Sequence, residues 1–126
     1  MPSRVLIVED EPELRTALRV RLTASGFICD IAGNGKEALA AIERSRPDLV
    51  VADLLMPVMD GYMLCRRIRE DARLAELPIV VLSAVPRHAI EQKEELKASR
   101  IMHKPFDAAE LVMVIQKLLR ETALGG

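Results

Sequence analysis

The sequence predicts an α/β fold, in which a five-stranded parallel sheet is doubly wound and carries helices on both faces. Short apolar segments rich in β-branched residues alternate with segments of helical spacing five times along the 126 residues. Strand–helix alternation of this kind is typical of parallel sheets, because each parallel crossover needs a connecting helix. Several of the short segments are apolar almost throughout, as expected for strands that are covered on both faces.

The predicted strands are short runs bounded by turn residues, and β-branched side chains dominate them. They cover residues 4–8, 27–32, 48–53, 78–83 and 100–103. The first, third and fourth are the most apolar, which predicts that they lie inside the sheet.

The first predicted helix follows Pro12, which suits an opening helical turn, and stops near Gly26. The second follows Asn34, a favourable N-cap, with Glu37 three residues later as in a capping box. The third is predicted from about residue 62 to residue 70, with Leu64, Cys65 and Ile68 facing inward.

A fourth helix is predicted between Pro86 and Lys97, where few apolar residues are available for packing. The last helix follows Asp107 as its cap, with Phe106 positioned to pack onto Leu111. Residues 1–126 are predicted to form one domain, in which 121–126 fray as a short tail.

Charge and composition exclude several classes of protein. The formal net charge is −1, so no basic excess indicates direct nucleic-acid binding, and Arg66, Arg67 and Arg69 are interpreted as the solvated face of a helix. No apolar run approaches the ~20 residues of a membrane span, and no signal peptide is apparent. Cys29 and Cys65 lack metal-ligand spacing, so free thiols and a cytoplasmic location are expected.

Polar residues stand where the predicted strands end. Glu9 and Asp10 follow the first strand, Asp53 ends the third, Ser83 ends the fourth and Lys104 follows the fifth. In doubly wound sheets the functional site lies beyond the carboxyl ends of the strands. These residues are therefore predicted to converge at one edge of the sheet.

The convergence predicts a particular chemistry. Carboxylates from neighbouring strands repel each other unless one is protonated or a cation lies between them. Mg²⁺ binds oxygen ligands of this type and often a phosphate as well. Lys104 and Ser83 can interact with phosphoryl oxygens, and Asp53 is then placed to act as a nucleophile that forms an aspartyl phosphate.

The segments "VLIVEDE", "DLVVADLLMPVMDG", "PIVVLSA" and "HKPF" together resemble bacterial response-regulator receiver domains, the CheY-like family. The resemblance covers nearly the whole chain and implies a flavodoxin-like sheet with strand order 2-1-3-4-5. It also implies that the chain accepts phosphate from a sensor histidine kinase or a phosphotransfer protein and signals to a downstream protein that the sequence does not identify. A receiver of this kind is not an enzyme that turns over an external substrate.

Carried over residue by residue, the resemblance assigns Asp53 as the phosphoacceptor. Asp10, Asp53 and the backbone carbonyl of Leu55 would bind Mg²⁺ directly, and Glu9 would do so through water. Lys104 and Ser83 would contact the phosphoryl group, and Ser83 would move inward on phosphorylation. Ile101 and Pro105 belong to the switch region, with a cis bond before the proline.

Three departures from the family pattern fall near the predicted output face, and the thinly apolar fourth helix is one of them. Ile101 occupies a switch position that is commonly aromatic, and Lys97 stands where a glycine is usual. A phosphate-independent interaction module is therefore an alternative function. A phosphorylation-dependent dimer through the last strand and its flanking helices is also left open.

An enzyme or cofactor-binding protein on the same fold is the remaining alternative. A flavodoxin-like protein needs a hydroxyl- and glycine-rich phosphate loop after its first strand, and this chain has "EDEPE" there. A phosphatase of the haloacid-dehalogenase type needs a D-x-D spacing that is absent at the same place. His88 and His103 show no metal-ligand spacing and are predicted to face solvent.

Overall fold

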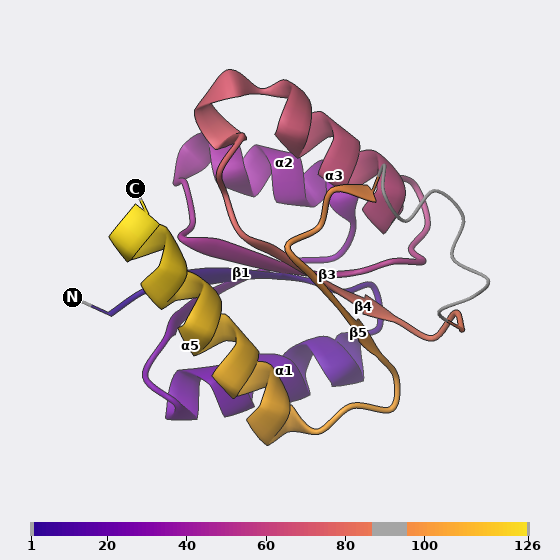
Figure 1. Ribbon diagram of the computed structural model, residues 1–126. Coiled ribbons are helices and arrows are strands. Elements are labelled where there is room, and N and C mark those ends of the chain that lie inside the picture. Colours follow the sequence, from indigo (N-terminus) through magenta and orange to yellow (C-terminus); the bar gives the residue numbers. More distant parts are fainter. Residues whose placement is uncertain (1, 87–95, 126) are drawn as a thin grey trace.

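The computed structural model describes residues 2–86 and 96–125, and it contains the predicted doubly wound sheet (Figure 1). The sheet has five parallel strands in the order β2-β1-β3-β4-β5, which confirms the predicted order. The strands are β1 (Arg4–Val8), β2 (Ile28–Ala32), β3 (Leu49–Asp53), β4 (Ile79–Ser83) and β5 (Arg100–His103).

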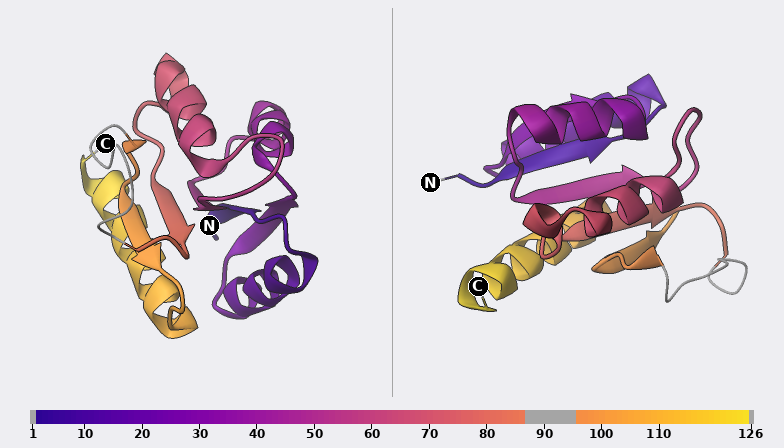
Figure 2. Two further views of the ribbon diagram at one scale, coloured as in Figure 1. Left: turned by 90° about the vertical axis from the view of Figure 1, so that its right-hand side faces the viewer. Right: turned by 90° about the horizontal axis from the view of Figure 1, so that it is seen from above.

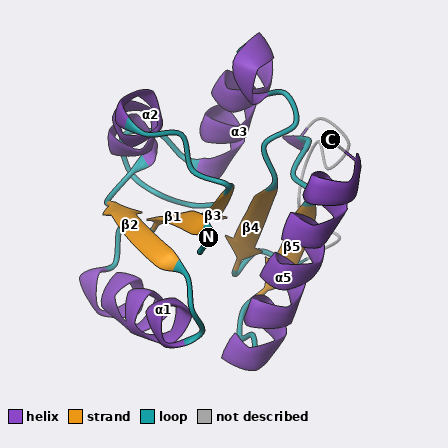
Figure 3. Cartoon of the chain, turned by 90° about the vertical axis from the view of Figure 1, so that its left-hand side faces the viewer, coloured by secondary structure: helices purple, strands orange, loops and turns teal. Residues whose placement is uncertain are grey.

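Helices cover both faces of the sheet (Figures 2 and 3). They are α1 (Pro12–Ala24), α2 (Gly35–Arg44), α3 (Gly61–Glu70), the short 3₁₀ helix η1 (Ala72–Leu74) and α5 (Ala108–Gly125). The core has two parts, because α2 and α3 pack on one face while α1 and α5 pack on the other. Every residue of β3 and β4 is buried, as their apolar sequences predict. None of the described helices is both long and apolar enough to cross a membrane.

Side-chain caps fix where several helices begin. Asn34 Oδ1 accepts from the Glu37 N–H at 2.9 Å, and Asp107 Oδ1 accepts from the Ala109 N–H at 2.9 Å, so both predicted caps are confirmed. The Glu37 carboxylate accepts from the N–H of Gly33 at 3.2 Å, one residue before the position that a standard capping box would use.

The last residues of the chain and the predicted fourth helix do not follow the sequence prediction in a simple way. Residues 121–125 continue α5, so the tail predicted to fray is helical up to Gly125. Leu118 in the preceding turn is buried, and the Thr122 hydroxyl donates to the Leu118 carbonyl at 2.9 Å. The predicted fourth helix lies almost entirely in residues 87–95, outside the described residues, although Leu96 is helical and buried.

The cysteines behave as expected from the sequence. Cys29 and Cys65 are free, and Cys65 is buried in the α2–α3 part of the core. Burial raises the pKa of the Cys65 thiol to about 12, so it remains protonated at neutral pH.

Arg69 is a structural residue rather than part of a solvated helix face. Arg66 and Arg67 are exposed as predicted, but the prediction was wrong for Arg69, which is only partly exposed. Its guanidinium donates to four carbonyl oxygens, those of Leu74 (3.2 Å), Ala75 (3.3 Å), Leu77 (2.7 Å) and Lys97 (3.1 Å). Arg69 therefore ties the end of α3 to the turn before β4 and to the turn before β5.

The hydrogen bond from Arg69 to the Lys97 carbonyl supports a turn with an unusual backbone conformation. Lys97 has a φ of 54°, a left-handed conformation that glycine adopts more easily than lysine does. The family resemblance implies a glycine at this position, and the hydrogen bond from Arg69 holds this turn against the neighbouring helix.

Replacing Arg69 by leucine is expected to lower the free energy of unfolding by about 2–3 kcal/mol, because carbonyls in partly buried turns lose a charged donor. Chemical denaturation measures this change. The matched variant Arg67→Leu removes an exposed arginine from the same helix and is expected to stay within about 0.5 kcal/mol of wild type. Equal effects of the two substitutions would show that Arg69 does not hold these turns.

Candidate functional site

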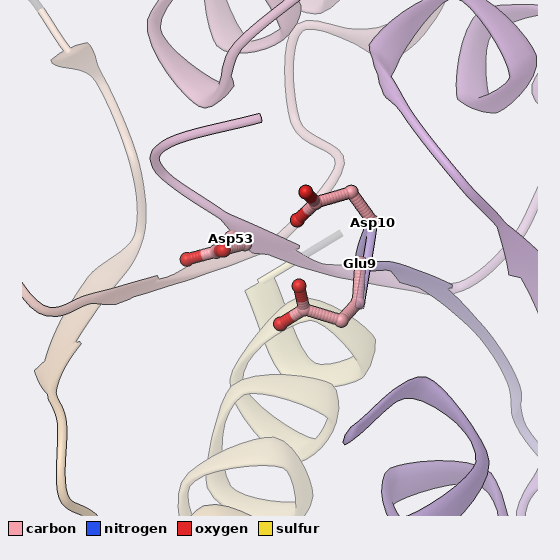
Figure 4. Close-up of side chains that lie close together, drawn as sticks. All are labelled: Glu9, Asp10 and Asp53. Carbon is pink, nitrogen blue, oxygen red and sulfur yellow. The ribbon is translucent and has the colours of Figure 1, made fainter. Parts of the chain in front are cut away.

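The predicted strand-end residues come together at the carboxyl edge of the sheet. Glu9 and Asp10 follow β1, and Asp53 is the last residue of the neighbouring strand β3. Figure 4 shows their side chains gathered where these two strands end. One carboxylate oxygen from each residue lies within 4.8 Å of the other two. Residues that are 43 positions apart in sequence (53 − 10) therefore form one acidic cluster.

The main chain around the cluster is held firmly. The Glu9 N–H donates to the Ala32 carbonyl of β2 at 3.0 Å, and the Glu9 carbonyl accepts from Arg15 Nη1 at 3.0 Å. On the other strand, the Leu54 N–H donates to the Leu82 carbonyl at 2.9 Å. The acidic side chains thus extend from backbone segments that are fixed by the sheet.

Lys104 is the cation that faces this cluster. It follows β5, and its Nζ lies 3.2 Å from Asp53 Oδ1 and 3.6 Å from Glu9 Oε1. The backbone N–H of Lys104 donates to the Ser83 carbonyl at 2.7 Å, which fixes the lysine relative to β4. The bond between Lys104 and Pro105 is cis, as the family resemblance implies.

The charges in the cluster do not balance among the described residues. Three carboxylates face one lysine, and both Glu9 and Asp53 are buried while Asp10 is exposed. Glu9 Oε2 accepts from the Glu11 N–H at 3.2 Å, but Glu9 Oε1 is buried with no hydrogen-bond donor among the described residues, and the Lys104 ammonium lies 3.6 Å from it. A buried carboxylate oxygen in this condition is costly unless a proton, a cation or water satisfies it.

Glu9 shows the consequence of this imbalance in its protonation. Burial, and to a smaller extent the negative charge of Asp53, raise the pKa of Glu9 to about 7. The Glu11 N–H and the Lys104 ammonium lower that pKa but do not compensate for the burial. A divalent cation bound by these oxygens would favour the ionised form, so the cluster fits a hard metal ion such as Mg²⁺.

The loop after Asp53 is shaped by features that the sequence interpretation missed. A Cβ on Gly61 would lie 2.8 Å from the Asp53 carbonyl oxygen and 2.8 Å from Leu54 Cα, so only glycine fits there. Asp60 caps α3 by accepting from the Met63 N–H at 3.0 Å. The signal available in the sequence was the Asp-Gly pair just before the helix.

The same loop contains a strained turn. Val58 has a φ of 69°, and the Met59 N–H donates to the Pro57 carbonyl at 2.7 Å, as in a γ-turn of the rare form. A β-branched residue in this conformation is unusual. Leu55 lies in this loop and is 56% exposed, and the role given to its carbonyl stays a prediction.

Ser83 lies at the site, but its hydroxyl is engaged elsewhere. Ser83 Oγ accepts from the Val85 N–H at 3.0 Å and donates to the Val85 carbonyl at 3.3 Å. His103 was predicted to face solvent, and this was wrong, because it is only partly exposed and its Nδ1 lies 3.3 Å from the Val85 carbonyl oxygen. Ile101 packs against the α2–α3 part of the core. His88 lies outside the described residues.

The raised pKa of Glu9 leads to a pH-dependent stability. The folded state holds the proton of Glu9 more tightly than the unfolded chain, so this contribution is complete below about pH 4.5 and is lost as the pH rises through about 7. In buffer containing a chelator, Glu9→Gln is expected to be more stable than wild type by about 1–3 kcal/mol at pH 8 and nearly equal to it at pH 4.5.

Denaturation curves between pH 4.5 and pH 8 measure the difference. The exposed residue Glu70, changed to glutamine, controls for the loss of one surface charge and should follow the wild-type pH dependence. Parallel pH profiles for wild type and Glu9→Gln would contradict the assignment of this proton to Glu9.

Comparison with known proteins identifies the family. Residues 5–116 match the family model described as "Response regulator receiver domain". The chain is 38% identical over 125 residues to the response regulator MprA of Mycolicibacterium vanbaalenii, covering 97% of this chain and 52% of that protein. The chain spans about half the length of most of the curated relatives it matches.

Comparison with solved structures leads to the same family. A putative response regulator from Chloroflexus aurantiacus superposes with a TM-score of 0.89 at 33% identity, covering 95% of this chain and 99% of that one. The signal receiver domain of a histidine kinase from Syntrophus aciditrophicus gives a TM-score of 0.89 at 32% identity, covering 94% and 90%. With the acidic cluster and its lysine at the carboxyl edge of the same sheet, the chain belongs to the response regulator receiver domain family of two-component systems.

Proposed function

We propose that this receiver domain accepts a phosphoryl group on Asp53 from a phosphohistidine of a sensor histidine kinase or a phosphotransfer protein. The observation that carries the proposal is the position of Asp53, which is buried at the end of β3, 3.2 Å from Lys104 and within the acidic cluster. Family membership provides the chemical context, and the geometry supports the choice of this aspartate among the described residues.

The proposed transfer is a simple displacement at phosphorus. A carboxylate oxygen of Asp53 attacks the phosphorus atom, a P–O bond forms, and the P–N bond to the donor imidazole breaks with its electron pair leaving on nitrogen. Lys104 stabilises the negative charge on the phosphoryl oxygens. Asp53 as a whole is 8% exposed, which limits its contact with bulk water.

The proposal assigns the metal ligands by combining the cluster with the family pattern. Asp10, Asp53 and the Leu55 carbonyl would hold Mg²⁺, and Glu9 would contribute through water. The buried, undonated oxygen of Glu9 and the proximity of the three carboxylates support this assignment. When bound, Mg²⁺ supplies positive charge that offsets the charge of the carboxylates and of the phosphoryl group.

The remaining parts of the proposal concern location and partners. Two free cysteines fit a reducing compartment, and we place the domain in the cytoplasm. We propose that its action is to signal rather than to turn over a substrate, through a downstream protein and without contacting nucleic acid directly. The relative RpaA of Synechocystis is named a DNA-binding transcriptional regulator, but this chain covers 50% of it.

Phosphorylation by acetyl phosphate tests the proposal directly. Intact-mass spectrometry of the protein incubated with acetyl phosphate and Mg²⁺ is expected to show one added phosphoryl group, because the small donor needs only the chemistry of the site. Asp53→Ala is expected to abolish the gain, and a chelator is expected to suppress it in wild type.

Asp30→Ala is the matched control, since Asp30 lies on the edge strand β2 and pairs with Arg4 away from the cluster. This variant should gain the phosphoryl group as wild type does. An unmodified wild-type protein, or a gain that persists in Asp53→Ala, would rule out the proposed acceptor.

A further inference from the structure

The carbonyl oxygen of Val85 has two side-chain neighbours that can donate to it. Ser83 Oγ and His103 Nδ1 each lie 3.3 Å from this oxygen. A carbonyl has two lone pairs and can accept both hydrogen bonds at once. Val85 is partly buried against the α2–α3 part of the core.

The strand register explains why these two side chains meet. Ser83 and His103 are the last residues of β4 and β5 and are paired directly across the two strands. Directly paired residues of parallel strands point to the same face of the sheet. The hydrogen bond from the Lys104 N–H to the Ser83 carbonyl fixes the same register, so His103 is held one residue before the lysine of the site.

The Ser83 hydroxyl carries only one proton. In the present arrangement that proton is directed to the Val85 carbonyl. If Ser83 is to donate to a phosphoryl oxygen on Asp53, the proton must leave Val85. If Ser83 were the only donor to this carbonyl among the described residues, its departure would leave a partly buried oxygen unpaired, and that cost would oppose the rearrangement.

We propose that His103 is a positioning residue that keeps the Val85 carbonyl hydrogen-bonded while Ser83 turns its hydroxyl toward the phosphoryl group. This inference rests on the proposed phosphorylation of Asp53. It requires a proton on Nδ1, since the carbonyl oxygen can only accept. His103 then acts through Ser83 and does not touch the phosphoryl group.

The proposal makes a specific prediction about substitutions at position 103. Leucine and phenylalanine remove the donor and put an apolar side chain of similar or larger size in its place. Asparagine retains an N–H donor at about the position of Nδ1, because its amide nitrogen is the same number of bonds from the backbone. His103→Asn should therefore preserve the function that His103→Leu and His103→Phe lose.

The probe is beryllium fluoride with Mg²⁺, which imitates the phosphoryl group on a carboxylate. Its affinity is measured by calorimetric titration, and circular dichroism checks that each variant is folded. His103→Leu and His103→Phe are expected to weaken binding about 3- to 10-fold, the size of one hydrogen bond. His103→Asn is expected to stay within about twofold of wild type.

A double-mutant cycle with Ser83→Ala separates positioning from a structural effect. In the Ser83→Ala background no hydroxyl needs to be released, so His103→Leu should cause no further loss of affinity. The inference is overturned if His103→Leu binds as wild type does, or if its loss is equally large without the serine. If folded wild-type protein does not bind beryllium fluoride, the proposed function itself fails, and the inference with it.

Discussion

The constraint on which the rest of this site depends is a cluster of three carboxylates, of which Lys104 contacts two. Lys104 contacts Asp53 and Glu9, but one ammonium cannot neutralise three ionised acids in a partly buried edge. The protein meets this constraint at Glu9, whose pKa is raised to about 7 by burial. A carboxyl group whose pKa lies near neutral pH can hold a proton when no cation is bound and release that proton when a cation binds. The acidic cluster is therefore a site prepared for positive charge.

The fold provides this arrangement by placing distant parts of the chain side by side. β1 and β3 are neighbours in the sheet although α1, β2 and α2 lie between them in sequence. β3 and β4 are buried on both faces, so the carboxylate of Asp53 extends from a rigid strand. Gly61 lets α3 begin directly against the backbone of Asp53 and Leu54. The strained turn at Val58 lies in the loop that joins β3 to α3. The same contacts that pack the core therefore also position the acidic side chains at the site.

Local patterns in the sequence were enough to predict the sheet, the helix caps and the strand-end acids. Asn34 and Asp107 act over three residues or fewer, so their roles are visible in the neighbouring letters. Asp53 could be singled out because an apolar strand that ends in an acid requires a partner. The strand order and the metal ligands came from the family resemblance, because spacing alone does not define which strands are neighbours.

The residues that escaped prediction act across the fold. Arg69 looks like a surface arginine in its helix, yet it donates to a carbonyl 28 positions away. His103 has no metal spacing, and its contact with Val85 depends on the pairing of β4 with β5. In each case the partner is set by tertiary structure.

Titration of the folded protein with Mg²⁺, followed by backbone NMR, is the most direct test of the claim that this cluster is built for a cation. The account predicts that the amide signals of Asp10, Asp53 and Leu55 shift in a saturable manner at millimolar Mg²⁺, while those of the remote strand residue Ile28 stay in place. The carboxyl carbon of Glu9 should report deprotonation at neutral pH during the same titration. Signals that remain unmoved at these residues throughout the titration would contradict the account.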